Sequence, residues 1–174
     1  MQRLAAFHRL DSEGWARHAN PWSGYSRMFT GLPLLILAVW SRVWIGWWAL
    51  AAVALVGLWL LLNPRLFPPP RDDRAWVSRA VFGEQFWIEK PRSAARFLTP
   101  TLPHILNGAA GLGLVPLIYG LATLHSAATV IGASIAFGGK MLFLEQMVRL
   151  YDRASRHDPA LRYAPARASD IGRG

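Results

Sequence analysis

The sequence predicts an all-α integral membrane protein, a four-helix bundle built from two helical hairpins, with amphipathic helices at the membrane interface. Hydrophobic residues make up 53% of the 174 residues and charged residues only 17%. Residues 43–62 carry no charge, and at ~1.5 Å per residue they span ~30 Å, the hydrocarbon thickness of a bilayer. Many of the nine tryptophans flank the apolar runs, as in the aromatic belts of membrane proteins.

Composition also excludes some functions. The sequence has no cysteine, which rules out disulfides, thiolate nucleophiles and Cys-ligated metal centres. A net charge of +9 is compatible with nucleic-acid binding, but basic loops facing anionic lipid explain the same excess in a membrane protein. We therefore expect anionic lipid headgroups as partners and no nucleic acid. The N-terminus lacks the uninterrupted apolar stretch of a cleavable signal peptide.

Residues 1–27 are assigned to a cytoplasmic or interfacial N-terminal segment. Apolar residues at roughly helical spacing predict a short surface helix there, namely Leu4, Phe7, Leu10 and Trp15. Within the following HANPWSGYSR, the Asn-Pro step predicts a turn.

Residues 28–62 are predicted to form the first transmembrane hairpin. Its first span, Met28–Trp40, is the weaker one, because the fourteen residues between Arg27 and Arg42 make a helix of only ~21 Å. Its second span is the uncharged run at 43–62. The two join at a tight turn, where four tryptophans gather as an aromatic belt: Trp40, Trp44, Trp47 and Trp48.

Residues 63–101 are predicted to be a cytoplasmic loop that carries an amphipathic helix. Three successive prolines exclude a helix through residues 68–70. The helix that follows, Arg74–Ile88, has one apolar face and is expected to lie in the membrane interface rather than to cross it; the face consists of Val77, Ala80, Val81 and Ile88.

Residues 102–148 are predicted to form the second hairpin, with spans Leu102–Leu124 and Ala127–Val148. Small residues are expected to let these two helices approach closely in lipid; the candidates are Gly108, Gly111, Ala128, Gly132 and Ala136. Residues 149–174 are rich in Arg and Pro without periodicity, which predicts a basic cytoplasmic tail on the surface.

The distribution of Lys and Arg predicts the orientation. The first 27 residues carry four, residues 63–96 carry seven, and the tail from Arg149 carries six, whereas the two hairpin turns carry only Arg42. The positive-inside rule then places both termini in the cytoplasm of a multi-pass protein. We expect a bacterial or archaeal cytoplasmic membrane.

Polar residues expected near the cytoplasmic face form a candidate site: His18, Asn20, Arg27, Asn63, Arg65, Glu84, Lys140, Glu145 and Arg149. The two Asn-Pro motifs among them have two interpretations. Either the Asn side chains bond to backbone groups freed by each proline and form an architectural clamp, or they line a polar pocket for a phosphate or carboxylate headgroup.

The charged candidates have similar alternatives. Lys140 lies deep enough in the fourth span that it must reach the interface or pair. Glu145 and Arg149 are spaced for an ordinary i,i+4 pair. Glu84, on the apolar face, either pairs with Arg79 or Arg149 or acts as an acid–base group with a raised pKa.

The five histidines show no metal-binding spacing such as H-E-x-x-H, so no metal and no cofactor is expected. A metal site assembled from scattered His and Glu residues stays open as an alternative.

Three segments, HANPWSGYSR, WSRVWIGWW and NPRLFPPP, resemble a family of small bacterial and archaeal membrane proteins classed as a domain of unknown function. The resemblance covers roughly residues 12–90, and GEQFWIEK fits it as well. It implies a membrane protein and supplies no activity.

Two functions remain. The first is a small polytopic inner-membrane protein without catalysis, an accessory or scaffolding subunit that binds lipid, a larger membrane complex or itself. The alternative is a membrane-embedded enzyme or small transporter that uses Glu84, Lys140, Glu145 and His18 at the cytoplasmic interface. The alternative requires these side chains to converge on a cavity, whereas an accessory subunit would have them dispersed or neutralised in pairs.

Overall fold

The computed structural model describes residues 12–163, and within that range its regular structure is entirely helical, which confirms the all-α prediction. The expected surface helix at Leu4–Leu10 and the end of the tail at 164–174 lie outside the described residues. The helices are α2 (Ser12–His18), α3 (Pro21–Trp40), α4 (Arg42–Ile45), the 3-10 helix η1 (Gly46–Trp48), α5 (Ala49–Leu66), α6 (Trp76–Glu89), α7 (Pro91–Ala94), α8 (Thr101–Thr123), α9 (Ser126–His157) and the 3-10 helix η2 (Pro159–Leu161).

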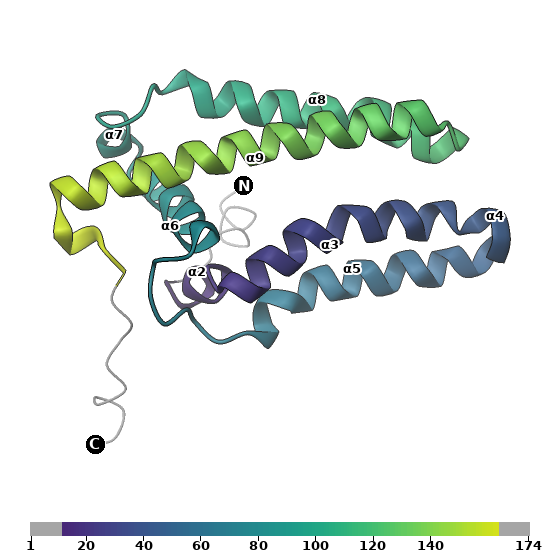
Figure 1. Ribbon diagram of the computed structural model, residues 1–174, viewed down its shortest axis with the longest axis horizontal. Coiled ribbons are helices and arrows are strands. Elements are labelled where there is room, and N and C mark those ends of the chain that lie inside the picture. The colour runs from purple at the N-terminus through teal and green to yellow at the C-terminus, as the bar shows by residue number, and fades with distance from the viewer. Residues whose placement is uncertain (1–11, 164–174) are drawn as a thin grey trace, which may run out of the picture.

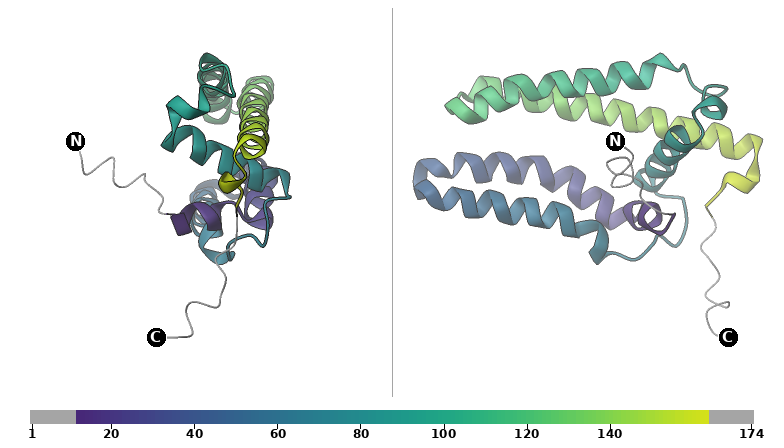
Figure 2. Two further views of the ribbon diagram at one scale, coloured as in Figure 1. Left: turned by 90° about the vertical axis from the view of Figure 1, so that its left-hand side faces the viewer. Right: turned by 180° about the vertical axis from the view of Figure 1, so that it is seen from behind.

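Two helical hairpins lie side by side and meet at the end where α6 is located (Figure 1, Figure 2). Hairpin 1 consists of α3 to α5, and hairpin 2 of α8 and the first half of α9. Three helical segments of the described chain are long and apolar enough to cross a membrane: Pro21–Leu66, Thr101–Thr123 and Ser126–His157. The first of these is hairpin 1 itself, because the chain reverses between α3 and α5 (Figure 1).

Helix α3 begins earlier than the sequence suggested, because the Asn-Pro step starts the helix instead of forming a turn. The Asn20 carboxamide oxygen accepts hydrogen bonds from the backbone N–H groups of Trp22 (2.9 Å) and Ser23 (3.2 Å). Pro21 occupies the first helical position, where its missing N–H has no partner to lose. The helix is therefore 20 residues long, or ~30 Å, instead of the ~21 Å expected from Met28.

The predicted uncharged span at 43–62 is interrupted at its start. Gly46 has φ +55°, a left-handed conformation that side-chain-bearing residues rarely adopt, and the chain changes there from α4 to η1. The long helix α5 begins only at Ala49. It continues through Asn63 and Pro64 to Leu66, four residues past the expected end.

Helices α8 and α9 contact each other through a row of small residues. Added methyl groups at the interface glycines would meet backbone atoms of the facing helix; the facing pairs are Ala110 with Gly139, Gly113 with Ala136, Leu117 with Gly132, and Gly120 with Thr129. Successive pairs advance by three, four and three residues on α8 and retreat by the same steps on α9, as antiparallel helices require. At Gly132 the added atom would lie 2.2 Å from the Leu117 backbone nitrogen, so the approach depends on glycine.

Two of the five expected packing residues do not take part in this contact. Added methyl groups at Gly108 and Gly111 would meet nothing within 4 Å, and both glycines are exposed. A helix turns ~100° per residue, so Gly111 lies on the opposite side of α8 from Gly113, which does face α9. Gly132 and Ala136 lie at the contact, and Ala128 is half-buried beside it.

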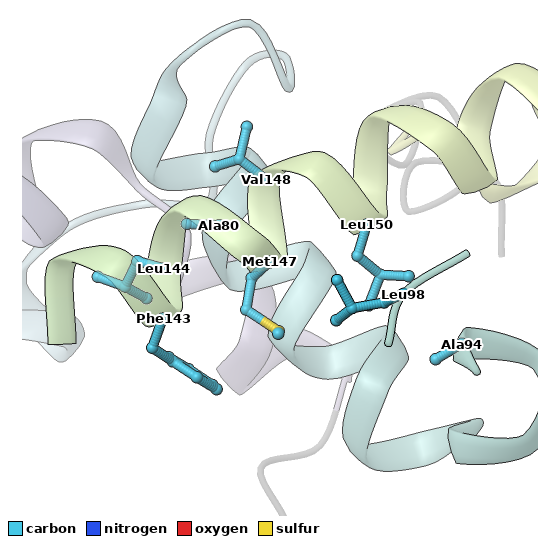
Figure 3. Close-up of a cluster of buried hydrophobic side chains, with 8 residues drawn as sticks. All are labelled: Ala80, Ala94, Leu98, Phe143, Leu144, Met147, Val148 and Leu150. Carbon is cyan, nitrogen blue, oxygen red and sulfur yellow. The ribbon is translucent and has the colours of Figure 1, made fainter. Parts of the chain in front are cut away.

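The buried core is located at the α6 end, in what we call the basal module: α2, residues 71–100 with α6 and α7, and residues 140–163. Its main cluster joins α6 and α7 to the second half of α9 and consists of Ala80, Ala94, Leu98, Phe143, Leu144, Met147, Val148 and Leu150 (Figure 3). Leu98 and Leu150 point toward each other in this view (Figure 3). Gly83 approaches so closely that an added methyl group would lie 2.0 Å from the Met147 carbonyl oxygen.

This core corrects two expectations. The apolar face of α6 packs on α9 instead of on the membrane interface, with Val77, Ala80 and Val81 buried, whereas Ile88 is exposed. Helix α9 does not stop at residue 148 but continues to His157. The reason is that Leu150, Tyr151 and Ala154 extend the buried face of α9 into the segment that was expected to be a tail. The first part of that segment therefore belongs to the core.

The two hairpins also touch away from the basal module. The Phe29 and Phe137 rings lie 6.3 Å apart between α3 and α9. At the far tip, the Arg42 Nη2 donates to the backbone carbonyls of Leu121 (2.7 Å) and Ala122 (2.6 Å). These carbonyls belong to the last turn of α8, which has no intrahelical donors for them.

Candidate functional site

The two Asn-Pro motifs form a buried polar clamp between α3 and α5. The Ser23 hydroxyl donates to Asn63 Oδ1 (2.7 Å), and Asn63 Nδ2 donates to Ser26 Oγ (2.9 Å). Ser23 and Asn63 are completely buried. Asn20 Nδ2 donates to the Pro68 carbonyl (2.8 Å), while its oxygen caps α3. The amide groups are thus used within the chain, as the architectural interpretation requires.

A second group joins α2 to α3. Arg27 donates from Nη2 to the His18 carbonyl (3.1 Å) and from Nε to the Ser23 carbonyl (3.1 Å), and its Nη1 lies 2.6 Å from His18 Nε2. Burial, and after it the positive charges of Arg27 and Lys140, lower the pKa of His18 to about 4. The imidazole is therefore neutral at pH 7 and accepts a hydrogen bond from the guanidinium.

Glu84 pairs with Lys140 and not with either arginine considered from the sequence. Lys140 Nζ lies 3.4 Å from Glu84 Oε1 and 4.4 Å from the centre of the Phe143 ring. Both side chains are partly exposed, Lys140 at 44% and Glu84 at 24%. The pair connects α6 to α9 at the level where hairpin 2 enters the basal module.

Glu145 and Arg149 form the expected i,i+4 pair, with 3.1 Å between Arg149 Nε and Glu145 Oε1. The other Glu145 oxygen accepts a hydrogen bond from Trp76 Nε1 at 3.0 Å, which the sequence did not suggest. Arg79, a sequence candidate for Glu84, instead binds Asp152 at 2.9 Å.

The nine candidate residues therefore separate into distinct places. The structure pairs His18 with Arg27 and Glu84 with Lys140, holds Asn20 and Asn63 in the clamp, and pairs Glu145 with Arg149. Arg65 is exposed and makes no ion pair or side-chain hydrogen bond to the residues that the structure describes.

Three cavities of the described chain lie in the basal module, away from these candidates. The first, of about 330 Å³, is lined by Phe82 of α6, Tyr151 of α9 and Tyr163 after η2, together with polar residues at the end of α6 such as Gln85 and Glu89. A small one of about 90 Å³ lies between Trp87 and His104. The third, of about 430 Å³, is polar and is lined by Asp73, Arg74, Arg79, Tyr151, Asp152, Ser155, Arg156 and Arg162.

Sequence reasoning missed the polar cavity entirely. Its residues come from two segments about eighty positions apart, so no local motif marks it. The available signal was the spacing of Arg149, Arg153 and Arg156 in a segment read as a tail, since steps of four and three are helical.

The histidines have separate structural roles. The His125 ring accepts a hydrogen bond from the Ala128 backbone N–H (3.2 Å) at the start of α9. The His104 ring packs against the Trp87 ring, with 5.1 Å between the ring centres. Among residues 12–163, no three His, Asp or Glu side chains are grouped so that they could hold a metal ion.

Comparison with known proteins gives one match. The model of a family described as "Family of unknown function (DUF6653)" matches residues 1–169, more than twice the extent of the resemblance seen in the sequence. No curated protein and no solved structure matches the chain. The expectation of an uncharacterised family is confirmed: the chain belongs to the family of unknown function DUF6653.

Proposed function

We propose that this protein is a polytopic membrane protein without its own catalysis, an accessory or scaffolding subunit that binds lipid or a larger membrane complex. One observation carries the proposal: the polar residues that a reaction site would need are occupied in contacts between helices. Asn63 joins α3 to α5, Lys140 joins α6 to α9 through Glu84, and Trp76 joins α6 to α9 through Glu145.

In this proposal four helices cross the membrane: α3, α5, α8 and the first part of α9. Three features support the orientation with the basal module in the cytoplasm. Helix α2, the end of α9 and α6 all lie at the same end of the two hairpins (Figure 1). That end carries most of the Lys and Arg residues. The opposite tip carries the exposed tryptophans Trp44, Trp47 and Trp48, which suit the outer interface.

The outer surfaces of both hairpins support a membrane or protein partner. Large apolar side chains are exposed along every long helix of the hairpins, for example Leu55, Val115, Ile118 and Val130. Soluble monomers rarely expose apolar patches of more than a few hundred Å², so these surfaces need lipid or another chain to cover them.

The absence of cysteine from the sequence makes a clean topology experiment possible. Single variants Trp47→Cys at the tip and Arg71→Cys before α6 would be treated with a membrane-impermeant maleimide, first in intact cells and then after lysis. We expect Trp47→Cys to react in intact cells and Arg71→Cys only after lysis. The reverse pattern, or reaction of both in intact cells, would contradict the proposed arrangement.

The accessory role is tested by extraction from native membranes in a mild detergent, followed by native mass spectrometry. We expect the chain in a larger assembly, with a second chain or retained lipid. Recovery of the bare monomer alone would count against an accessory subunit.

A membrane-embedded enzyme or small transporter is the second candidate, favoured by the neutral His18 beside Arg27 and by the Glu84–Lys140 pair, whose ammonium also lowers the pKa of His18. An enzyme or transporter would use the Glu84 carboxylate and the Lys140 ammonium for different tasks, so each group would have to stay at its own position. The exchanged variant E84K/K140E would then lose activity, whereas a purely structural pair tolerates the exchange.

A further inference from the structure

We propose that the polar cavity of the basal module is a binding site for a phosphate group. The cavity lies between the start of α6 and the end of α9 and has a volume of about 430 Å³. Its lining is chemically distinct from the hairpins, because arginine, serine and tyrosine side chains line one space.

The first argument is charge. Four arginines and two aspartates line the cavity, which leaves an excess of two positive charges. Arg79 is bound to Asp152, and Asp73 accepts a hydrogen bond from the Tyr151 hydroxyl at 2.7 Å.

Two of the arginines are left over. Arg156 and Arg162 are exposed, and within the described part of the chain no carboxylate lies within ion-pair distance of either. Planar guanidinium groups bind phosphate oxygens in a bidentate manner, so unpaired arginines at one cavity favour this ligand over a neutral one.

The second argument is hydrogen bonding. Ser155 is 4% exposed, and its hydroxyl makes no hydrogen bond of ordinary geometry in the described structure, although it lies close enough to the Tyr151 hydroxyl to lower the pKa of that group. The Nε of Arg79 is also buried without a partner. Buried donors are nearly always satisfied in native proteins, and those left over mark a place where a ligand or water belongs. Both groups are donors that match phosphate oxygens.

The third argument is depth, and it rests on the proposed membrane position. Tyr151 lies twenty-five residues beyond Ser126, or ~38 Å along α9, which is ~8 Å past a hydrocarbon layer of ~30 Å. This is the level of lipid headgroups. A lipid phosphate and a soluble phosphate therefore both reach the cavity, and experiment must separate them.

The test uses the full chain purified in an uncharged detergent. Inorganic phosphate is titrated against chloride at equal ionic strength, and the shift in melting temperature is recorded. A parallel sample in phosphatidylcholine nanodiscs, with and without phosphatidylglycerol, is examined by native mass spectrometry for retained anionic lipid.

The variant R156Q/R162Q removes two exposed, unpaired arginines of the cavity, and R92Q/R96Q, on exposed positions elsewhere in the basal module, is the matched control with the same change of charge. We expect binding of at least one probe to weaken by about tenfold or more in R156Q/R162Q and to persist in R92Q/R96Q. Ser155→Ala is expected to weaken binding by about tenfold without lowering the melting temperature, because it deletes an unsatisfied hydroxyl.

Binding of inorganic phosphate identifies a soluble source, and retention of phosphatidylglycerol without a phosphate effect identifies a lipid source; either supports the site. No binding of either probe, or equal weakening in the two double variants, overturns it. Failure here is distinguishable from failure of the proposed function, because cysteine labelling reports membrane orientation independently of phosphate.

Discussion

The basal module and the hairpins are held together by different means. The basal module buries large side chains such as Phe143, Met147 and Leu150 between α6 and α9, as a soluble protein does. The hairpins bury mainly small residues, Leu117 and the polar clamp at Asn63, and they expose most of their large apolar side chains. The comparison teaches that the hydrophobic effect stabilises one end of the molecule, whereas close backbone contact and hydrogen bonds hold the other.

The largest expected effect tests the core of the basal module. Phe143 is fully buried, so Phe143→Ala should lower the free energy of unfolding by ~3–5 kcal/mol. Its neighbour Leu142 is exposed, and Leu142→Ala should change the free energy by no more than ~0.5 kcal/mol. Denaturant unfolding of the two variants in detergent measures both. Similar losses would remove the distinction between the two regions.

The next effect concerns the junction between the two regions. Because the pKa of folded His18 is about 4 and that of an unfolded histidine ~6.5, the unfolded chain binds the extra proton first as the pH falls. The stability that neutral His18 contributes to the folded protein is therefore fully present above about pH 6.5 and decreases as the pH falls. At pH 4 the free energy of unfolding has dropped by roughly 3 kcal/mol on this account.

The measurement is the pH dependence of unfolding for the wild type and for His18→Gln between pH 7 and pH 4. The variant lacks the titrating group, so its stability should fall less steeply with acid than that of the wild type. Parallel curves would show that His18 is not held neutral in the folded protein.

A smaller effect tests close helix contact in hairpin 2. An added methyl group at Gly132 meets the Leu117 backbone, so Gly132→Ala should cost ~1–3 kcal/mol, whereas Gly111→Ala meets nothing and serves as the control. Hydrogen exchange should accelerate in α8 and the first half of α9 while α6 keeps its protection. Faster exchange throughout α6 would instead mean that the hairpin and the basal module unfold as one unit.

The smallest effect concerns the partly exposed pair of Glu84 and Lys140. Ion pairs of this exposure contribute ~0–1 kcal/mol, so Lys140→Glu should lower the melting temperature only slightly. The exchanged variant E84K/K140E should recover most of that loss. If the exchange destabilises more than the single change, the pair is fixed by its surroundings in the basal module and not by its charges.

The parts of the fold that depend on local chemistry were predictable. Helix α8 was expected at Leu102–Leu124 and lies at Thr101–Thr123, because apolar length and flanking prolines decide its ends. The i,i+4 pair of Glu145 and Arg149 was predictable for the same reason. The start of α3 was missed although its signal is local, since Asn followed by Pro is a cap as well as a turn.

The parts of the fold that depend on which distant segments of the chain contact each other were not predictable. The apolar face of α6 is compatible with a membrane surface and with a protein core, and only the extra length of α9 decides between them. Arg79 had several acidic residues available, and its pairing with Asp152 follows from the packing of α6 on α9. The polar cavity results from that same packing, which explains why no sequence pattern pointed to it.

The contact between Arg42 and the carbonyls of Leu121 and Ala122 has a mechanical consequence for the whole molecule. Two rods fixed only at the basal module would behave as cantilevers, whose free tips undergo the largest thermal displacement. A second attachment at the tips converts them into beams supported at both ends, in which bending is greatest near the middle. One arginine side chain thus restrains the outer tips of the hairpins, beyond the Phe29–Phe137 contact that joins α3 to α9.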